Sequence, residues 1–294
     1  MQYVVFVTDH NFWMHLYVSL YSLLKNNKDE KFVVYILTDM VNENFTGKLP
    51  FLYNMGNLVN CEILEINKSM IDSFPINERL SYISKATYYR IFIGSLLPSE
   101  IKKVLYLDCD TIVEAPLNEL FNLSLQQHVL AATEDRAGED CAERMDLPDG
   151  FKYFNAGVML INIEKWRSLG IEGRLLDFIN KNSDKLIYNE QDALNAVLYN
   201  EYLLISPKFN FQEYNNEMFT PNVEPYIIHY LGSPKPWSYL SEYPHRQRYW
   251  DYLKETPYQE YSESDRTFLN ILIKHLKIKP ALRRVKKILL TNYS

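Results

Sequence analysis

The sequence predicts an α/β protein, because short apolar runs rich in β-branched residues alternate with a stretch in which leucines recur at helical spacing. Residues 3–8 (YVVFVT) form the first run, leucines at positions 16, 20, 23 and 24 follow it, and residues 31–37 (KFVVYIL) form the second run. A strand, a helix and a strand in this order are typical of a parallel sheet. We therefore expect a parallel sheet flanked by helices.

Later segments continue the alternation. In chain order they are an expected strand at 61–66, a helix at 84–98, a strand at 102–107, a strand that turns into a helix at 154–167, a capped helix at 189–200 and a strand at 226–232. Ser84 is the expected N-cap of the helix at 84–98 and Pro98 its stop, which places Arg90 in mid-helix among apolar residues. The strand at 226–232 is expected to end in His229.

The composition is that of a globular protein with one large core, or with one core and an appendage. Of the 294 residues, 47% are hydrophobic and 23% are charged. The N-terminal apolar run is short and lacks a basic flank, so we expect neither a signal peptide nor a membrane anchor there. No stretch reaches the roughly 18 apolar residues of a spanning helix, and three scattered cysteines without a CxxC motif indicate a reducing compartment. We therefore expect a cytoplasmic protein.

The charge is unevenly distributed along the chain. The net charge is −6, yet residues 274–294 contain seven Lys and Arg and no acidic residue. An acidic body with a basic tail indicates an anionic surface as partner of the tail, and excludes nucleic acid as partner of the whole. The composition also changes near residue 240, where aromatic and then basic residues follow. We therefore expect a main domain at 1–240 and an aromatic and basic helical region at 241–294.

The segment ALRRVKKILL after Pro280 has the pattern of a basic amphipathic helix. Its apolar residues fall on one side at helical spacing, and its cations fall largely on the other side: Arg283, Arg284, Lys286 and Lys287. Such a helix is typical of peripheral attachment to an anionic membrane surface. A solvated or packed C-terminal helix, or an oligomer contact, is the alternative.

Two aspartates, Asp108 and Asp110, follow the expected strand at 102–107 with only Cys109 between them. Carboxylates this close repel each other unless a cation binds between them; a helix cap beside a solvent-exposed side chain is the alternative. In an open α/β sheet, ligands bind outside the carboxyl ends of the strands, and Asp9, Asp110 and His229 lie at or just past such ends. We therefore expect the aspartates to bind a divalent cation that bridges them to phosphate oxygens.

His229 is a candidate third ligand. Imidazole is a poor ligand for Mg²⁺, so its participation would shift the preference toward Mn²⁺; the alternative is a hydrogen-bonded core histidine. In the following GSPKPW segment, Gly232 permits close backbone approach and Lys235 offers a point charge to phosphate. From the residues alone, the prediction is a metal and phosphate site on an α/β sheet.

Six motifs in a fixed order resemble glycosyltransferase family 8, in particular its bacterial lipopolysaccharide-type galactosyl- and glucosyltransferases. They are FVTDHNF, ATYYRIFIGSLLP, VLYLDCDTIV, FNAGVMLINIEKWR, EQDALN and HYLGSPKPW, and they span the chain from residue 1 to about residue 237. The resemblance implies a GT-A fold with a Rossmann-like mixed sheet flanked by helices. It also implies a UDP-galactose or UDP-glucose donor, a glycan or lipid-linked glycan acceptor, Mn²⁺ with Mg²⁺ as a weaker substitute, and retention of anomeric configuration.

The resemblance further implies roles for individual residues. The implied metal ligands are Asp108, Asp110 and His229, with Cys109 beside them in the nucleotide-sugar site and Gly232 and Lys235 on the diphosphate. The implied uridine site is Val7, Thr8, Asp9, Asn11 and Phe12, in which Asp9 accepts from the uracil ring and Phe12 lies against it. The ribose and donor sugar would be held by Arg90, Asp135, Asn155 and Gln191, and Glu190 and Gln191 would be the catalytic pair. The structural alternatives are a core position for Phe12, an ion pair within its own helix for Arg90, and a turn position for Asn155.

Two departures from the family pattern concern Glu190, where the family often has Asp, and His10, where a second acid is common. Retention is compatible with a covalent intermediate on Glu190 or with front-face attack, in which the leaving phosphate deprotonates the acceptor. A sugar-nucleotide pyrophosphorylase would need a glycine-rich loop after the first strand, and the chain has no glycine before Gly47. A non-catalytic binding module and an inverting GT-A transferase are the remaining alternatives.

Overall fold

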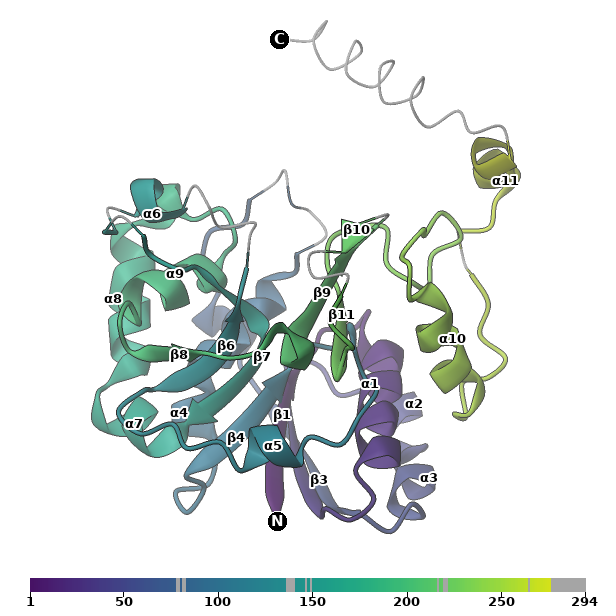
Figure 1. The fold of residues 1–294 in the computed structure, drawn as a ribbon, viewed down its shortest axis with the longest axis horizontal. Coiled ribbons are helices and arrows are strands. Elements are labelled where there is room, and N and C mark those ends of the chain that lie inside the picture. The colour runs from purple at the N-terminus through teal and green to yellow at the C-terminus, as the bar shows by residue number, and fades with distance from the viewer. Residues whose placement is uncertain are drawn as a thin grey trace, which may run out of the picture.

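The computed structural model describes residues 1–77, 80, 83–135, 141–145, 147, 148, 150–215, 217, 218, 222–263 and 265–275. Helices lie on both sides of a central sheet (Figure 1), so the predicted α/β class with a mixed sheet is confirmed. The order of its strands is β3-β2-β1-β4-β7-β6-β8. Their bounds are Gln2–Val7 (β1), Phe32–Thr38 (β2), Leu58–Glu65 (β3), Lys103–Leu107 (β4), Leu130–Glu134 (β6), Phe154–Asn162 (β7) and Tyr202–Leu204 (β8).

All strands of this sheet except β7 run in the same direction, as the strand and helix alternation predicted for most of it. β1 pairs in parallel with β2 and β4, and β2 pairs in parallel with β3. β7 instead runs antiparallel to both of its neighbours, β4 and β6. Parallel neighbours need a crossover that returns the chain to the same end of the sheet, and the chain enters β7 at the end where it leaves β6. The expectation of a parallel sheet is therefore corrected at β7.

A second, smaller sheet continues from the first. Its order is β10-β9-β11-β5, and its strands are Thr111–Val113 (β5), Phe211–Tyr214 (β9), Glu217–Met218 (β10) and Ile227–Tyr230 (β11). β4 ends at Leu107 in the large sheet and β5 begins at Thr111 in the small one. The turn between them is held from both sides: the Asp108 backbone N–H donates to Gly157 at 2.8 Å, and the Asp110 carbonyl accepts from Tyr230 at 3.1 Å. Residues 108–110 are thus the joint between the two sheets.

Two apolar clusters cover the two faces of the large sheet. Alternation along β1 divides it between them: Val4 and Phe6 lie in the first cluster, and Val5 and Val7 lie in the second. The first cluster is built with helices α1 (Trp13–Asn26), α2 (Glu43–Thr46), α3 (Leu49–Tyr53) and α10 (Arg246–Lys254). The second is built with the 3₁₀ helix η3 (Lys85–Phe92) and helices α4 (Ile93–Leu96), α7 (Ile163–Ser168), α8 (Ile171–Lys181) and α9 (Glu190–Val197).

The remaining elements are short. They are the helices α5 (Asn118–Phe121), α6 (Cys141–Arg144) and α11 (Phe268–His275) and the 3₁₀ turns η1 (Lys68–Met70), η5 (Ser183–Lys185) and η6 (Pro207–Asn210). The predicted helix at 84–98 begins as expected, because the Ser84 side chain accepts from the Ala86 backbone N–H. It is a 3₁₀ helix for its first eight residues and α-helical only from Ile93 to Leu96.

The cap predicted for the helix at 189–200 is corrected. α9 begins at Glu190, and Asn189 before it has a φ of 51° and makes no side-chain cap bond. The carboxylate of Asp192 in the first turn reaches back and accepts the backbone N–H groups of Ile187 at 2.6 Å and Tyr188 at 2.9 Å, both of which precede the helix. The turn before α9 is therefore fixed by an acid inside the helix. The strand at 226–232 also differs slightly, since β11 continues one residue past His229.

The described residues after position 240 pack against the main body. Tyr249 and Leu253 of α10 are buried in the first cluster with α1, and α10 lies beside α1 in Figure 1. The division at residue 240 remains a prediction from composition. Phe268 and Leu269 of α11 are 77% and 63% exposed. The basic segment predicted after Pro280 lies outside the described residues, and none of the helices within them is long and apolar enough to span a bilayer.

Candidate active site

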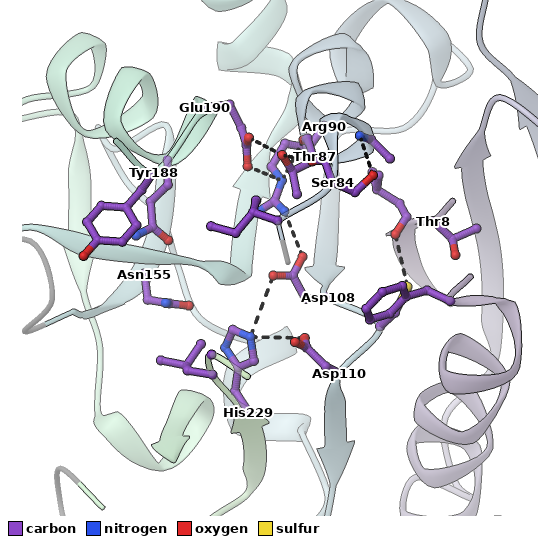
Figure 2. Close-up of a pocket in the computed structure, with 18 of the residues that line it drawn as sticks. Thr8, Ser84, Thr87, Arg90, Asp108, Asp110, Asn155, Tyr188, Glu190 and His229 are labelled. Atoms are coloured by element: carbon purple, nitrogen blue, oxygen red, sulfur yellow. Dashed lines mark hydrogen bonds and ion pairs between the residues drawn. The ribbon is translucent and has the colours of Figure 1, made fainter. Parts of the chain in front are cut away.

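A pocket opens where β1, β4, β6 and β11 end near the joint between the sheets. Every site residue predicted from the sequence lines this pocket except Asn11. The side chains come from remote parts of the chain, as Figure 2 shows for Thr8, Arg90, Asp108, Asn155 and His229. The fold therefore brings together almost the whole set that the motifs selected.

At the N-terminal wall of the pocket, the chain leaves β1 in a tight turn. The carboxylate of Asp9 accepts the backbone N–H of Asn11 at 2.8 Å, which leaves the Asn11 side chain exposed and outside the pocket lining. Phe12 lines the pocket and meets Trp237 edge to face at 5.7 Å between ring centroids. This wall is thus apolar at Phe12 and acidic at Asp9.

Three ligand-type side chains converge at the joint. The carboxylate and imidazole atoms of Asp108, Asp110 and His229 all lie within 4.8 Å of one another. His229 Nε2 is 3.3 Å from Asp110 Oδ1 and 3.8 Å from Asp108 Oδ2. Figure 2 shows both carboxylates pointing toward the ring. Two hard oxygens and one imidazole nitrogen that face a common point are a donor set for a divalent cation.

The local backbone provides the room for this cluster. A Cβ atom at Gly157 would lie 2.1 Å from His229 Cε1 and 2.9 Å from Asp108 Oδ2. Only glycine leaves the imidazole and the carboxylate in these positions. His229 is itself oriented by its other nitrogen, because Nδ1 lies 3.0 Å from Asn210 Oδ1. The residues present therefore fit a bound divalent cation in ligand type, spacing and space.

Lys235 adds a positive charge beside the cluster. Its Nζ donates to Asp110 Oδ2 at 2.5 Å and to the Tyr230 carbonyl at 2.6 Å. Burial alone would raise the pKa of Asp110, but the positive charge of the neighbouring Lys235 acts in the opposite direction, and the balance holds that pKa below its ordinary value. Asp110 is therefore ionised at neutral pH. Gly232, which precedes Lys235, has a φ of 76° in the left-handed region that favours glycine.

Arg90 connects the cluster of Asp108, Asp110 and His229 to Glu190. Its Nη2 donates to Asp108 Oδ1 at 2.9 Å, and its Nε lies 3.2 Å from Glu190 Oε1. The guanidinium also lies 4.5 Å from the centroid of the Tyr106 ring, whose hydroxyl donates to the same Asp108 oxygen at 2.6 Å. Burial lowers the pKa of Arg90, but the Asp108 carboxylate and its neighbours more than offset this and raise it above its ordinary value. Arg90 is thus a permanent cation shared by two carboxylates.

Glu190 is almost fully buried at the start of α9. Its Oε2 accepts the Thr87 hydroxyl at 2.6 Å, and Oε1 faces Arg90 (Figure 2). Burial raises the pKa of Glu190, although Arg90 and Thr87 act in the opposite direction. Both carboxylate oxygens of Glu190 are therefore engaged by protein groups.

The wall around Asp135, here called the amide wall, consists mainly of amides. Asn155 Nδ2 donates to Asp135 Oδ2 at 2.8 Å, and Gln191 Nε2 donates to the same oxygen at 3.2 Å. The backbone N–H of Ala156 donates to Gln191 Oε1 at 2.9 Å, which fixes the orientation of that amide. The wall thus presents neutral, directed hydrogen-bonding groups around one carboxylate.

Several residues at the site were missed by sequence reasoning. Thr87 and Tyr106 lie inside two of the six motifs, and their neighbours were selected instead because Arg and Asp carry more obvious chemistry. Tyr188 and Tyr214 line the pocket without any motif signal. Asn210 lies outside every motif and does not line the pocket, so only its contact with His229 reveals it.

The chain resembles a set of known glycosyltransferases over most of its length. The family model described as Glycosyl transferase family 8 matches residues 3–241. General stress protein A of Bacillus subtilis (strain 168) is 32% identical over 254 residues, which cover 80% of this chain and 87% of that protein. A lipopolysaccharide 1,2-glucosyltransferase of Escherichia coli is 29% identical over 246 residues, which cover 78% of this chain and 71% of that protein.

Solved structures give the same result. A crystal structure of the galactosyltransferase LgtC in complex with donor and acceptor sugar analogs matches with a TM-score of 0.77 and 26% sequence identity, and the match covers 87% of this chain and 96% of that one. The apo form of the glycosyltransferase GlyE from Streptococcus pneumoniae TIGR4 matches with a TM-score of 0.66 and 26% identity, over 85% of this chain and 59% of that one.

Proposed function

The chain belongs to glycosyltransferase family 8, and from this premise we propose that it transfers galactose or glucose from a UDP-sugar to a glycan or lipid-linked glycan, with retention of anomeric configuration and with Mn²⁺ as cofactor. The family and the hexosyltransferase class that the motifs predicted are confirmed by the family match and by the likeness to a galactosyltransferase. The donor, the metal, the stereochemistry and the acceptor are the proposed part.

One observation supports the proposal: three side chains of metal-ligand type lie together in the same pocket as an apolar and acidic wall and an amide wall. Asp108, Asp110 and His229 would hold the cation, which would supply Lewis-acid stabilisation of charge on the diphosphate. A ligand with a base, a diphosphate and a sugar meets matching groups in this order. Mn²⁺ is favoured over Mg²⁺ because one of the three ligands is an imidazole.

The protein groups divide the remaining work. Lys235 is placed to donate to the leaving diphosphate, where negative charge grows as the bond to the sugar breaks. Arg90 holds Asp108 and Glu190 at a fixed spacing. Both oxygens of Glu190 contact protein groups, so we propose that Glu190 positions Arg90, and that the acceptor attacks from the face that the diphosphate leaves, giving its proton to a phosphate oxygen. Gln191 and Asp135 would orient the sugar for this attack.

Donor hydrolysis and transfer provide the test. Purified protein would be incubated with UDP-galactose, UDP-glucose and other UDP-hexoses in Mn²⁺, in Mg²⁺ and in EDTA, and released UDP would be measured. We expect turnover of one UDP-hexose that is highest in Mn²⁺, lower in Mg²⁺ and absent in EDTA. NMR of the transferred sugar should show the anomeric configuration of the donor. Equal turnover in EDTA would refute the proposed metal requirement, and a product of inverted anomeric configuration would refute the proposed retention.

We further propose that the protein acts on the cytoplasmic face of a membrane and attaches there through residues 276–294. The support is the run of cations in this segment and the exposed apolar side chains of Phe268 and Leu269 just before it. Cations near an anionic leaflet contribute on the order of 1 kcal/mol each before screening. Together with inserted apolar residues, they would give reversible attachment at the surface where lipid-linked acceptors are found.

The membrane proposal is tested in the full-length chain. Replacement of Arg283, Arg284, Lys286 and Lys287 by glutamate reverses the charge of residues 276–294 and changes none of the described residues. The wild-type protein should sediment with anionic liposomes at low salt and less at high salt, while the variant stays in solution with unchanged donor hydrolysis. A variant that sediments equally well would refute membrane attachment and leave the catalytic proposal intact.

A further inference from the structure

A row of buried side-chain amides connects His229, one of the proposed metal ligands, to Asp135 in the amide wall. His229 Nδ1 lies 3.0 Å from Asn210 Oδ1, Asn210 Nδ2 lies 2.9 Å from Asn155 Oδ1, and Asn155 Nδ2 lies 2.8 Å from Asp135 Oδ2. All four side chains are at most 4% exposed. Buried polar groups of this kind are costly unless each bond is made, so the row defines a single arrangement of donors and acceptors.

The direction of each hydrogen bond in the row follows from a backbone N–H that contacts the row at Asn155. The backbone N–H of Gly157 can only donate, and it donates to Asn155 at 2.9 Å, so the contacted atom of Asn155 is its oxygen. That oxygen also meets Asn210, which must therefore present its NH₂ group there and its oxygen to His229. An amide oxygen can only accept, so His229 Nδ1 must carry the proton. The hydrogen-bond pattern thus excludes the neutral tautomer of His229 that carries its proton on Nε2.

We propose that Asn210 is a positioning residue: through its bond to Nδ1 it keeps the Nε2 lone pair of His229 directed at the divalent cation that Asp108 and Asp110 would share. This inference rests on the proposed function for the metal, but the tautomer itself does not. Without Asn210, the nearest acceptor for a ring proton is Asp110 Oδ1, 3.3 Å from Nε2. The proton would then move to Nε2, and the ring would be blocked as a ligand.

Asparagine is suited to this role because it both accepts and donates. Its oxygen takes the proton of His229 while its NH₂ group is held by Asn155, and Asn155 is in turn held by Asp135. Groups that hold a metal-ligating histidine through its second nitrogen commonly change metal affinity by about 10- to 100-fold when they are mutated. Since Asp135 also accepts from Gln191, the same row of hydrogen bonds couples the orientation of His229 to the amide wall.

The first experiment requires no variant. The full-length protein is labelled with ¹⁵N-histidine and kept free of metal, and long-range ¹H–¹⁵N correlation spectra report which nitrogen of each neutral ring carries the proton. The His229 signals are assigned by their loss in His229→Gln. We expect Nδ1–H at His229 in the wild-type protein. A wild-type ring with its proton on Nε2 would overturn the proposal outright.

The second experiment compares Asn210→Leu, which keeps the size but removes both bonds, with Gln212→Leu as a matched control. Gln212 is also buried, two residues along the chain, and its amide donates to Thr133 and to the Glu134 carbonyl instead of contacting His229. Mn²⁺ alone is titrated into each protein, and free Mn²⁺ is read from its EPR signal. In Asn210→Leu we expect the proton on Nε2 and a Kd for Mn²⁺ that is about 10- to 100-fold higher; in Gln212→Leu both stay as in the wild type.

A third variant, Asn210→Asp, guards against a failure of Asn210→Leu to fold, because its carboxylate keeps an acceptor for Nδ1–H. It should retain the wild-type tautomer. Retention of Nδ1–H or of the wild-type Kd for Mn²⁺ in Asn210→Leu would overturn the proposal. Equal changes of tautomer and Kd in Gln212→Leu would also overturn it, because they would show a general effect of losing buried hydrogen bonds. If the wild-type ring has Nδ1–H but the protein binds no Mn²⁺, the metal part of the proposed function fails and the tautomer assignment stands.

Discussion

The two ends of the pocket are built from different chemistry. The acidic end, made of Asp108, Asp110, His229 and Lys235, consists of two carboxylates and one imidazole that face one another, with the Lys235 ammonium beside them. The amide end, made of Asp135, Asn155, Glu190 and Gln191, consists of neutral amides around one carboxylate, together with a glutamate whose pKa is raised by burial. Arg90 touches both ends. The first end suits a charged group of any orientation, and the second suits a neutral group in one orientation.

This difference indicates how one pocket can combine strength with selectivity. A diphosphate and a cation would supply attraction that is nearly independent of the sugar, because Coulomb forces have little angular preference. Two hexoses differ only in the direction of a hydroxyl, and such a difference is read by hydrogen bonds of fixed geometry, since a buried partner that is left unpaired costs about 1–3 kcal/mol. Substitutions at the acidic end should therefore affect every donor, and substitutions at the amide end should affect the reaction or the choice of donor.

The largest effect is expected for Asp110→Asn or Asp108→Asn. Each change keeps the shape of the side chain but removes charge that would hold the cation. Several kcal/mol of lost transition-state stabilisation corresponds to on the order of 1000-fold or more in rate. Transfer would be measured with saturating Mn²⁺, and circular dichroism would confirm the fold. Asp177→Asn, an exposed aspartate on α8, is the control. Normal turnover of both variants in EDTA would exclude the metal site.

Glu190→Gln is expected to have the next largest effect. Gln keeps an oxygen for Arg90 but loses the charge, so Arg90 is held less firmly while the donor still binds. If Glu190 is a positioning group, transfer should fall by about 100-fold, with donor affinity within a few-fold of the wild type in calorimetry. A fall to the background rate, with binding intact, would instead identify Glu190 as the nucleophile of a covalent intermediate. Glu134→Gln, an exposed glutamate on β6, is the control and should leave transfer unchanged.

His229→Ala should have a smaller effect, because two of the three proposed ligands remain. We expect the Mn²⁺ concentration for half-maximal activity to rise by at least about 10-fold, with activity partly restored by excess metal. His128→Ala serves as the control, since His128 hydrogen-bonds to Gln127 and to the Leu125 carbonyl and does not line the pocket. An unchanged metal requirement would return His229 to the role of a buried core histidine.

The smallest effect concerns stability as a function of pH, where the two ends should have opposite signs. The folded state lowers the pKa of Asp110, so its contribution is present above its ordinary pKa of 3.8 and is lost as the pH falls through the folded value. The folded state raises the pKa of Glu190, so the wild type loses stability as the pH rises from 4.5 through the folded value. Thermal melts of wild type, Asp110→Asn and Glu190→Gln from pH 3 to 8 test this. Parallel curves for Glu190→Gln and wild type would contradict it.

The sequence predicted the acidic end better than the amide end, for a physical reason. Asp108, Asp110 and His229 carry chemistry in their residue types and lie at strand ends, where parallel sheets place ligands. Thr87, Tyr106 and Asn210 are residues of ordinary type whose roles follow from contacts with positions 103, 2 and 19 residues away. Strand identity was also readable from apolar runs, and the family and fold predictions are confirmed.

Strand direction and helix capping were less accessible. An apolar run such as residues 154–162 has the same pattern in either direction, so the antiparallel course of β7 left no mark in the sequence. Asn189 has a preferred capping residue type, but it has a positive φ and makes no cap bond, and Asp192 fixes the turn before the helix without capping it. The individual site roles that the motifs implied remain predictions, to which the pocket adds a shared location for all of them except Asn11.

Because residues 108–110 join the two sheets, donor and cation bound there would stiffen the contact between the sheets. Asp108 directly follows β4 of the large sheet, whereas His229 belongs to β11 of the small one, so a cation held by both would add a cross-link between the two sheets. By mass action, a ligand at 100 times its Kd adds about 2.7 kcal/mol to the folded state. This stabilisation should be largest in the strands next to residues 108–110. Amide hydrogen exchange of β5 and β11 should therefore slow on addition of donor and metal, while exchange of the distant β3 changes little, so that the working enzyme is a stiffer object than the idle one.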